Sequence, residues 1–364
     1  MKATLISGEG ASVTWQKAAS RILRNGEEQQ SRIGKTREMR HVVLDVHNPI
    51  DRVVFSRPIN PAFAIAEVIW ILAGANRSEF IKFWNPRLVN YLDQNKDYFH
   101  GAYGYRIGSS PKLSARAEKS LRVVPNNFSE KFDQLKQAIE ILENHPSSRQ
   151  VVLQIWSSEL DFPNPNPRSL DIPCNVFGHL LLRNNKLEWT QMMRSTDLVW
   201  GLPYNFIQWT TIQEIVAGWL DVSVGNHVLI SNSLHVYEHH WNQLERWSRT
   251  KKPSNIGLPL SVKLRSYDEW QFIFSLIVDF ALDLVESRTR DEIITVTERG
   301  SDFPKGYGEW AYLLGADALR RKGYREEAKE IILKSGRYWS ESWLNWEENK
   351  YKRKLSGISN NEKK

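Results

Sequence analysis

The only cysteine of this chain, Cys174, is its clearest candidate for covalent chemistry, and it stands in the segment LDIPCN. A lone cysteine is most often a small buried hydrophobe. Here Pro173 restricts the backbone that leads to the thiol. Arg194 is expected on the neighbouring strand after a hairpin, where a guanidinium would favour the reactive thiolate. We therefore interpret Cys174 as a nucleophile.

Two further polar residues stand in apolar surroundings. Glu67 is the one acid in the segment Asn60–Gly74, which is predicted to form a buried helix. Such a carboxyl can transfer protons, or backbone groups can simply satisfy it. Asn205 follows GLPY near the start of a second apolar helix and offers an amide. A thiol, an acid and an amide could together form a site for nucleophilic and proton-transfer chemistry.

Two other uses of these residue types have less support. His235 and His239 would lie one turn apart if HVYEHH were helical, but no further ligand motif accompanies them, so no metal is expected. Cys174 and a histidine could form a hydrolase pair. No family-specific sequence of that class surrounds the thiol, however.

The elements that must position these residues are helices and strands. Apolar and alternating runs predict strands at 39–49, 149–156, 175–184, 186–195 and 227–240, the last leading into a helix. Asn184–Asn185 predicts a hairpin turn. Helices are expected at 13–24, 60–74, 128–146 and 204–220. After about residue 250, the segment 308–350 is typical of helices joined at Gly323 and Gly336, without a fixed repeat.

Composition limits the class of protein. With 364 residues, 41% of them hydrophobic, the chain can bury a large core. One cysteine and no charged-then-apolar leader predict a reducing, cytoplasmic location. The most apolar segment, 272–285, is short and contains Asp279 and Asp283, so no membrane span is expected.

The net charge of +7 raises the question of anionic partners. Much of the excess lies in the C-terminal end and in the segment 109–122, and both are predicted to be solvated and mobile. Nucleic acid could bind there, but no RNA-binding signature or paired-cysteine zinc pattern accompanies them. Solubility is the favoured explanation of this charge.

Several motifs occur together in a recognisable order. They are AEVIWILAG with Glu67, FWN with Trp84, GAYGYR with Tyr103, SRQVVLQIW with Arg149, PCN with Cys174, RSTD with Arg194, WGLPYN with Asn205 and SLHVY with His235. Single motifs are weak, but the ordered set, from about residue 32 to 240, resembles the thymidylate synthases and their relatives, the pyrimidine nucleotide hydroxymethylases.

The resemblance implies a fold and a domain organisation. It implies the α+β thymidylate synthase-like fold, with a large twisted mixed sheet backed by helices. We expect residues 1–250 to form the catalytic domain, 251–350 a helical C-terminal extension, and 351–364 a mobile basic tail. A homodimer with shared active sites is also implied, with the sheet face as the contact.

The resemblance also implies a chemistry. The ring carbon C5 of a uracil is a poor nucleophile until a group adds to C6, and a thiolate can both add and leave. Cys174 would form this adduct, and C5 would then attack the methylene of 5,10-methylenetetrahydrofolate, the co-substrate. Glu67 would manage protons through water, and Tyr103 would help to remove the C5 proton.

Matching positions supply the binding residues. Those for the nucleotide phosphate are Arg32, Arg194 and Ser195, with Arg149 reaching the partner subunit's site. His235 and Tyr237 would bind the ribose hydroxyls, and Asn205 the base. Asp197 would hold the pterin of the folate, and Trp84 would form an aromatic wall beside it.

Three departures from the family pattern leave the product open. Asn175 replaces a histidine, Gln150 replaces an arginine, and the C-terminal segment that closes over the folate has no counterpart. Loss of that closure would let water intercept the exocyclic methylene and give a hydroxymethyl product. Thymidylate formation is slightly favoured because Asn205 is present, hydroxymethylation is the close alternative, and a non-catalytic nucleotide-binding protein is the third.

Overall fold

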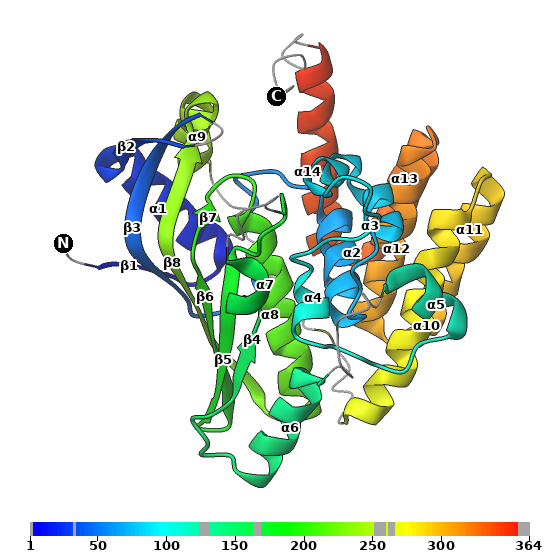
Figure 1. Cartoon of the computed structure of the whole chain (residues 1–364). Helices are drawn as coiled ribbons and strands as arrows, with labels where there is room; N and C mark the ends of the chain where they lie inside the picture. Colours follow the sequence, from blue (N-terminus) through cyan, green and yellow to red (C-terminus); the bar gives the residue numbers. More distant parts are fainter. Residues whose placement is uncertain are drawn as a thin grey trace.

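The structure is a computed structural model that describes residues 3–31, 34–123, 132–162, 169–250, 260 and 266–355 (Figure 1). Its strands are β1 (Thr4–Gly8), β2 (Glu27–Gln30), β3 (Lys35–Val46), β4 (Val152–Gln154), β5 (Asn175–Arg183), β6 (Lys186–Met193), β7 (Thr196–Asp197) and β8 (Ser223–Tyr237). Its first nine α-helices are α1 (Ala11–Asn25), α2 (Pro61–Leu72), α3 (Ser78–Trp84), α4 (Tyr103–Arg106), α5 (Ala115–Leu121), α6 (Gln134–Asn144), α7 (Ser158–Asp161), α8 (Leu202–Trp219) and α9 (Trp241–Ser248). The C-terminal helices are α10 (Tyr267–Glu286), α11 (Arg290–Glu298), α12 (Lys305–Arg321), α13 (Arg325–Ile332) and α14 (Gly336–Leu355).

The strands form one mixed, twisted sheet in the order β1-β3-β8-β6-β5-β4, with β2 paired to β3 and β7 to β8. The β1–β3 and β6–β8 pairs are parallel, and the other neighbours along this order are antiparallel. Asn184 and Asn185 close the β5–β6 hairpin, and their φ angles of 50° and 57° suit the turn that their sequence predicts. The predicted α+β class and mixed sheet are confirmed.

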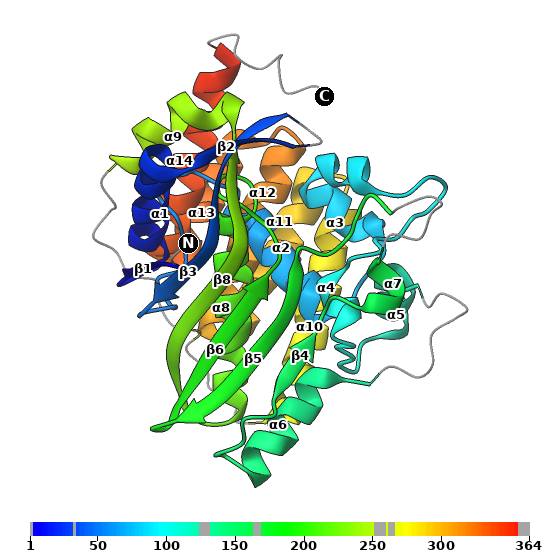
Figure 2. The same ribbon diagram turned by 60° about the vertical axis from the view of Figure 1, so that its left-hand side comes forward.

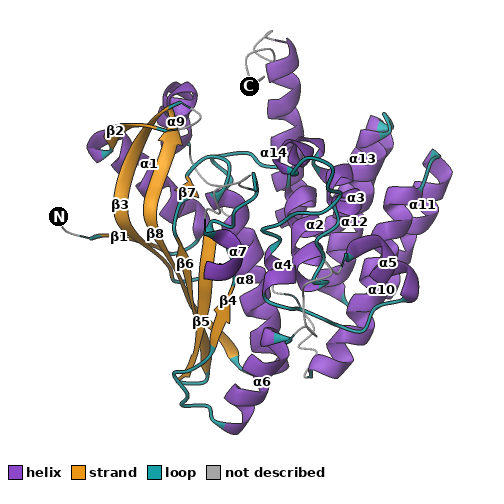
Figure 3. Ribbon diagram, in the orientation of Figure 1, coloured by secondary structure: helices purple, strands orange, loops and turns teal. Residues whose placement is uncertain are grey.

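The helices lie on one face of the sheet. Figure 2 shows the other face in front, and no helix of the described chain covers it. On the covered face, α8 packs on β6 and β8, α2 packs on α8, and α12 packs on α2, to the right of the sheet in Figure 3. Side chains on β6 alternate between buried and partly exposed, as expected for a strand with one covered face.

Helix α2 is the centre of this packing. Asn60 caps its first turn, since its side-chain oxygen accepts from the N–H of Ala62 at 3.0 Å, and Pro61 starts the helix. Within α2 every residue but Glu67 is buried. The helix is therefore packed on all sides, and Glu67 is its one side chain that is only partly buried.

The C-terminal helices share a hydrophobic core with the rest of the molecule. Buried residues of α10 and α12, such as Trp270 and Leu314, belong to the same cluster as those of α2 and α8. The joints at Gly323 and Gly336 have φ angles of 97° and 75°, which glycine adopts without strain. None of the helices in the described ranges is long and apolar enough to cross a membrane.

The prediction that residues 109–122 form a mobile surface segment was wrong. Ser109 is buried, and α5 begins just after Ser114, whose hydroxyl donates to Asp279 on α10 at 2.7 Å. Arg116 pairs with Asp283 on the same helix at 2.6 Å. Arg116 thus faces acids that lie far away in the sequence, whereas Arg122 pairs with Glu118 of the same segment. At the C-terminus, α14 continues to Leu355, and residues 356–364 lie outside the described ranges.

Candidate active site

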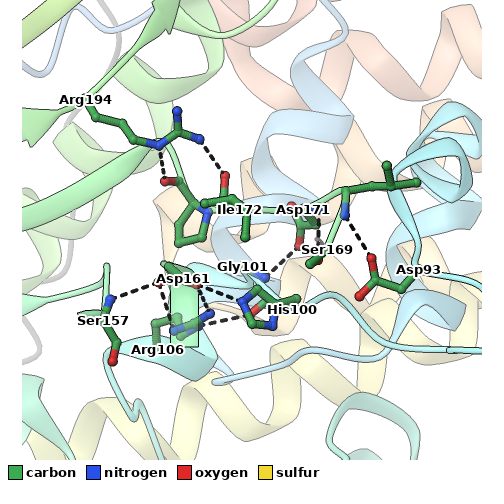
Figure 4. A network of polar contacts seen from close by, with 12 residues as sticks. Asp93, His100, Gly101, Arg106, Ser157, Asp161, Ser169, Asp171, Ile172 and Arg194 are labelled. Atoms are coloured by element: carbon green, nitrogen blue, oxygen red, sulfur yellow. Dashed lines mark hydrogen bonds and ion pairs between the residues drawn. The ribbon is translucent and has the colours of Figure 1, made fainter. Parts of the chain in front are cut away.

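Cys174 lies immediately before β5, in a segment that Arg194 holds from the adjacent strand end. The backbone N–H of Arg194 donates to the carbonyl of Cys174 at 2.9 Å. Its guanidinium reaches back to the carbonyl oxygens of Pro173 and Ile172 at 2.9 and 3.0 Å (Figure 4). Arg194 is nevertheless exposed. The thiol is therefore held beside a cation that still faces solvent.

The charges around Cys174 act in opposite directions. Burial raises the pKa of the Cys174 thiol, the Arg194 guanidinium lowers it, and the carboxyl groups of Asp171 and Asp197 raise it again. The net pKa lies above the ordinary value for a thiol. In the nucleotide-free protein the thiol is therefore largely protonated at neutral pH, and the adjacent arginine is the group that favours its ionisation.

Asp171 joins the cysteine segment to the loop that carries Tyr103. Its carboxylate accepts from the backbone N–H of Gly101 at 2.7 Å (Figure 4). Beneath this loop, Asp161 accepts from Arg106 at 2.7 Å and lies 2.7 Å from the ring of His100. These long-range contacts fix the thiol and the phenol relative to each other.

Tyr103 begins α4 and lies among the candidate catalytic groups. Burial strongly raises the pKa of its phenol; the charges of Cys174, Asp171 and Glu67 raise it further, while the Asn175 side chain opposes them. All four groups are therefore near enough to the phenol to change its pKa. Its ring packs on that of Trp209, 5.9 Å between centroids. Tyr103 is a neutral phenol at physiological pH.

Asn175, beside the thiol, is oriented by a chain of buried amides. The indole N–H of Trp189 can only donate, and it does so to the Gln191 side-chain oxygen at 3.0 Å. The Gln191 amide nitrogen must then face Asn175, and it donates to the Asn175 oxygen at 2.9 Å. The Asn175 amide nitrogen makes no hydrogen bond of ordinary geometry among the described residues, and this side chain is the one that lowers the pKa of the Tyr103 phenol. It remains available as a buried donor beside Cys174 and Tyr103.

Glu67 has the environment of a proton-transfer group. Burial raises the pKa of its carboxyl to about 8, although a hydrogen bond from Gln208 lowers it. The carboxyl therefore carries a proton at neutral pH. It accepts from the Gln208 amide nitrogen at 2.9 Å, and the Gln208 oxygen in turn accepts from the Asn205 amide nitrogen at 3.1 Å. The acid and the amide singled out from the sequence are thus connected through one residue.

The remaining nucleotide-binding candidates gather around β7 and β8. The hydroxyl of Ser195 is 3.5 Å from His235, and the ring of His235 packs edge-on against Tyr237 at 5.4 Å. His235 lies in a strand and not in a helix, so it is not one helical turn from His239. Arg32 lies outside the described residues.

Arg149 is the candidate that the structure places apart from the others. It precedes the edge strand β4 and is exposed, and its carbonyl accepts from His179 at 3.2 Å. His179 lies on β5, five residues after Cys174, or roughly 16 Å away at the usual rise of a strand. Within one chain, Arg149 therefore stands well away from the thiol.

The folate-side candidates differ in exposure. Asp197 is partly exposed, and one carboxylate oxygen accepts from the N–H groups of Val199 and Trp200 at 2.7 and 2.9 Å. Trp84 is only 1% exposed. Arg321 of α12 lies over the Trp84 ring and donates to its carbonyl. The C-terminal helices thus cover the tryptophan that the sequence suggests as an aromatic wall.

Sequence reasoning missed two residues of this site. Gln208 follows Asn205 by three positions on an apolar helix, so helical spacing could have indicated that both amides share a face. Asp171 stands three residues before the thiol, but its contact with Gly101 depends on tertiary structure that the sequence does not reveal.

Comparisons with known proteins agree on one family. The family model described as thymidylate synthase matches residues 13–283. The chain is 34% identical over 235 residues to a deoxyuridylate hydroxymethyltransferase of Bacillus phage SP01. The aligned region covers 64% of this chain and 58% of that protein. A second deoxyuridylate hydroxymethyltransferase, of Pseudomonas phage M6, is 30% identical over 200 residues, 54% of this chain and 50% of its own length. A thymidylate synthase of Mycoplasma mobile is 24% identical over 241 residues, 63% of this chain and 81% of that protein. The chain therefore spans between half and three fifths of the length of the two phage proteins.

Proposed function

This chain belongs to the thymidylate synthase family, and we propose that it transfers a one-carbon unit from 5,10-methylenetetrahydrofolate to C5 of a deoxyuridylate. The main support for the proposal is that a thiol, a carboxyl group and an amide all lie around the phenol of Tyr103. Tyr103 lies within electrostatic range of Cys174 and Glu67, and Glu67 is joined through Gln208 to the base-reading candidate Asn205. A nucleophile, an acid and an amide at one site are what addition to C6 and substitution at C5 require.

Each residue then has a defined role. Cys174, with its ionisation favoured by Arg194, adds to C6 and makes C5 nucleophilic. The folate supplies the methylene that C5 attacks. Glu67, protonated at neutral pH, can deliver a proton toward the ring oxygen through water. Tyr103 stays a neutral phenol, so it assists loss of the C5 proton by passing the proton along its hydroxyl.

The binding residues follow the same division of the site. Arg194 and Ser195 bind the phosphate, together with Arg32, and His235 and Tyr237 bind the sugar. Asp197 holds the pterin. Trp84, buried beneath Arg321, supports this region from behind and does not form an exposed wall.

A hydroxymethyl product is the second candidate, and specific observations favour it. Two of the relatives compared above carry the name deoxyuridylate hydroxymethyltransferase. Helix α12 also contacts Trp84 through Arg321, in the region where closure over the folate is expected in the family. Water that reaches the exocyclic methylene would yield the hydroxymethyl nucleotide in place of the methyl one.

One experiment separates these products. The protein is incubated with deoxyuridylate and 5,10-methylenetetrahydrofolate, and the nucleotide is identified by mass. A methyl or a hydroxymethyl nucleotide supports one-carbon transfer and identifies the product. An unchanged nucleotide, with binding intact, would instead favour a non-catalytic nucleotide-binding protein.

The assembly proposed for this chemistry is a homodimer that pairs the open faces of two sheets. The open face in Figure 2 and the separation of Arg149 from Cys174 support it. If Arg149 serves the partner's site, mixing inactive Arg149→Ala and Cys174→Ser chains should restore activity, because one site of a mixed dimer is intact. Mixed dimers that form and stay inactive would exclude this role for Arg149.

A further inference from the structure

We propose that Gln208 is a positioning residue that couples recognition of the base at Asn205 to the orientation of the Glu67 carboxyl. The inference rests on the proposed function for its chemical meaning, but not for its geometry. Gln208 is buried on α8, three residues after Asn205, and Glu67 faces it from α2. Its two hydrogen bonds, 3.1 Å to Asn205 and 2.9 Å to Glu67, run in one direction through a single amide.

The donor-to-acceptor direction of these two hydrogen bonds follows from the chemistry of the three side chains. An Asn205 amide nitrogen can only donate, so the Gln208 oxygen must face it. The Gln208 nitrogen then faces Glu67 and donates to one carboxyl oxygen. That oxygen is an acceptor, so the proton of the neutral acid stays on the other oxygen. Gln208 therefore determines which oxygen of Glu67 carries the proton.

The same series of hydrogen bonds fixes which polar groups Asn205 presents to a base. One of its two N–H groups is used by Gln208. The second N–H and the side-chain oxygen remain, and together they form one donor and one acceptor. This pair matches the O4 and N3–H of uracil. A cytosine edge has the reverse pattern, so the wrong base would leave buried groups unpaired.

Coupling arises because neither end can change alone. If Asn205 became an aspartate, its carboxylate would face the Gln208 oxygen, and two acceptors would oppose each other. Rotation of the Gln208 amide would relieve this contact and turn its oxygen toward Glu67. Glu67 would then have to donate from the oxygen that now accepts. A change in the base-reading residue is thus transmitted to the acid.

Other titratable groups near Glu67 do not replace this control. Tyr103 on α4 and Tyr204 on α8 both lie within electrostatic range of Glu67. Burial raises the pKa of Tyr204 to about 12 and that of Tyr103 further, so both remain neutral while Glu67 titrates. The hydrogen bond from Gln208 favours the ionised form of Glu67, so its loss should raise the pKa of that carboxyl.

The test follows the titration of Glu67 in the nucleotide-free protein. Glutamate is labelled with ¹³C at its carboxyl carbon, and Glu67→Gln identifies the resonance of Glu67. Gln208→Met removes both hydrogen bonds at similar volume. Gln213→Met is the matched control, because Gln213 is also buried on α8 but binds the Leu187 carbonyl and His227.

Gln208→Met should raise the titration midpoint of Glu67 by about one pH unit, as expected for loss of one hydrogen bond to a carboxylate. Gln213→Met should leave the midpoint unchanged. An unchanged midpoint in Gln208→Met, or an equal shift in both variants, would overturn the proposal. If Gln208→Met does not fold, Gln208→Glu serves instead, and the shared proton of two adjacent carboxyls should raise the midpoint; no rise would overturn it.

A double-mutant cycle tests the coupling itself. Asn205→Asp should raise the Glu67 midpoint in the wild-type background and raise it less in Gln208→Met, where the transmitted part is lost. Equal shifts in both backgrounds would leave only direct repulsion and would contradict coupling through Gln208. Because no substrate is used, a protein that transfers no one-carbon unit would refute the proposed function and leave this result standing.

Discussion

The candidate active site has two halves that are held in place differently. The strand-borne half, Cys174, Arg194, Ser195 and His235, lies at strand ends, where the backbone of Arg194 bonds Cys174 and its guanidinium bonds the backbone carbonyls before the thiol. The helix-borne half, Glu67, Asn205 and Gln208, lies on two packed helices and is joined by side-chain amides. A backbone hydrogen bond can survive substitution of a side chain. In a series of side-chain hydrogen bonds, by contrast, one substitution alters the orientation of the next residue. Substitutions in the first half should therefore act locally, and those in the second should act at a distance.

The largest effect is expected in the strand-borne half. Cys174→Ser should abolish turnover and retain nucleotide binding, because serine keeps the shape of the thiol but offers no available anion near pH 7. Turnover is measured by product formation and binding by calorimetry. Loss of binding as well would show that the thiol is needed for the structure of the site. Turnover within tenfold of the wild type would refute its role.

Glu67→Gln removes the acid of the helix-borne half. It removes the titrating proton but keeps an oxygen that can accept from Gln208. Turnover should fall by about 10²–10⁴-fold, the usual contribution of a general acid or base, with little change in nucleotide affinity. The measurement is kcat with deoxyuridylate and folate. A decrease smaller than tenfold would return Glu67 to a purely structural role.

Asp317→Asn tests how the C-terminal helices support the helix-borne half. Asp317 is buried on α12, bonds Arg320 and Arg321 at 2.7 Å each, and accepts from the α2 cap Asn60 at 3.3 Å. Its removal leaves Arg321 without its carboxylate and Arg320 with Glu347 alone, at 3.7 Å, and should lower the free energy of unfolding by about 3–5 kcal/mol. Urea denaturation measures this, with the exposed Asp302→Asn as control.

The pH dependence of Asp317 has a definite sign. Burial alone would raise its pKa, but Arg321 and Arg320 outweigh burial and hold it at about 2, below the ordinary 3.8. Its stabilising contribution is therefore complete above pH 3.8 and is lost as the pH falls through 2. The stability difference between wild type and Asp317→Asn should be constant near neutrality and narrow below about pH 4. A difference under 1 kcal/mol at pH 7 would contradict this account.

Asn205→Asp has the smallest expected effect, and it changes both the base-reading residue and the partner of Gln208. A carboxyl suits the cytosine edge, so preference should shift from uridylate toward cytidylate by about 1–3 kcal/mol, or roughly 5–150-fold in relative kcat/KM. Turnover on either base should also fall, because Gln208 must reverse. Specificity constants on both nucleotides measure the shift. A wild-type preference for cytidylate would contradict the assignment of Asn205 as a residue that recognises uracil.

The sequence reveals the two halves to different degrees. The strand-borne half could be predicted, because Cys174 and Arg194 stand in local motifs and the Asn184–Asn185 turn fixes the hairpin between them. Glu67 was visible as one acid in an apolar helix. Its partner Gln208 was not identified, because the contact depends on how α2 and α8 pack. The docking of residues 109–122 on α10 was missed for the same reason, since its acids lie more than a hundred residues away.

The most direct test of the central claim is release of tritium from C5 of labelled deoxyuridylate. In the proposed mechanism, addition of Cys174 at C6 makes C5 reactive, and substitution at C5 must then expel its hydrogen. Wild-type protein should release tritium in the presence of 5,10-methylenetetrahydrofolate, and Cys174→Ser should release none above background. No release by the wild-type protein, or release by Cys174→Ser at the wild-type rate, would contradict that claim.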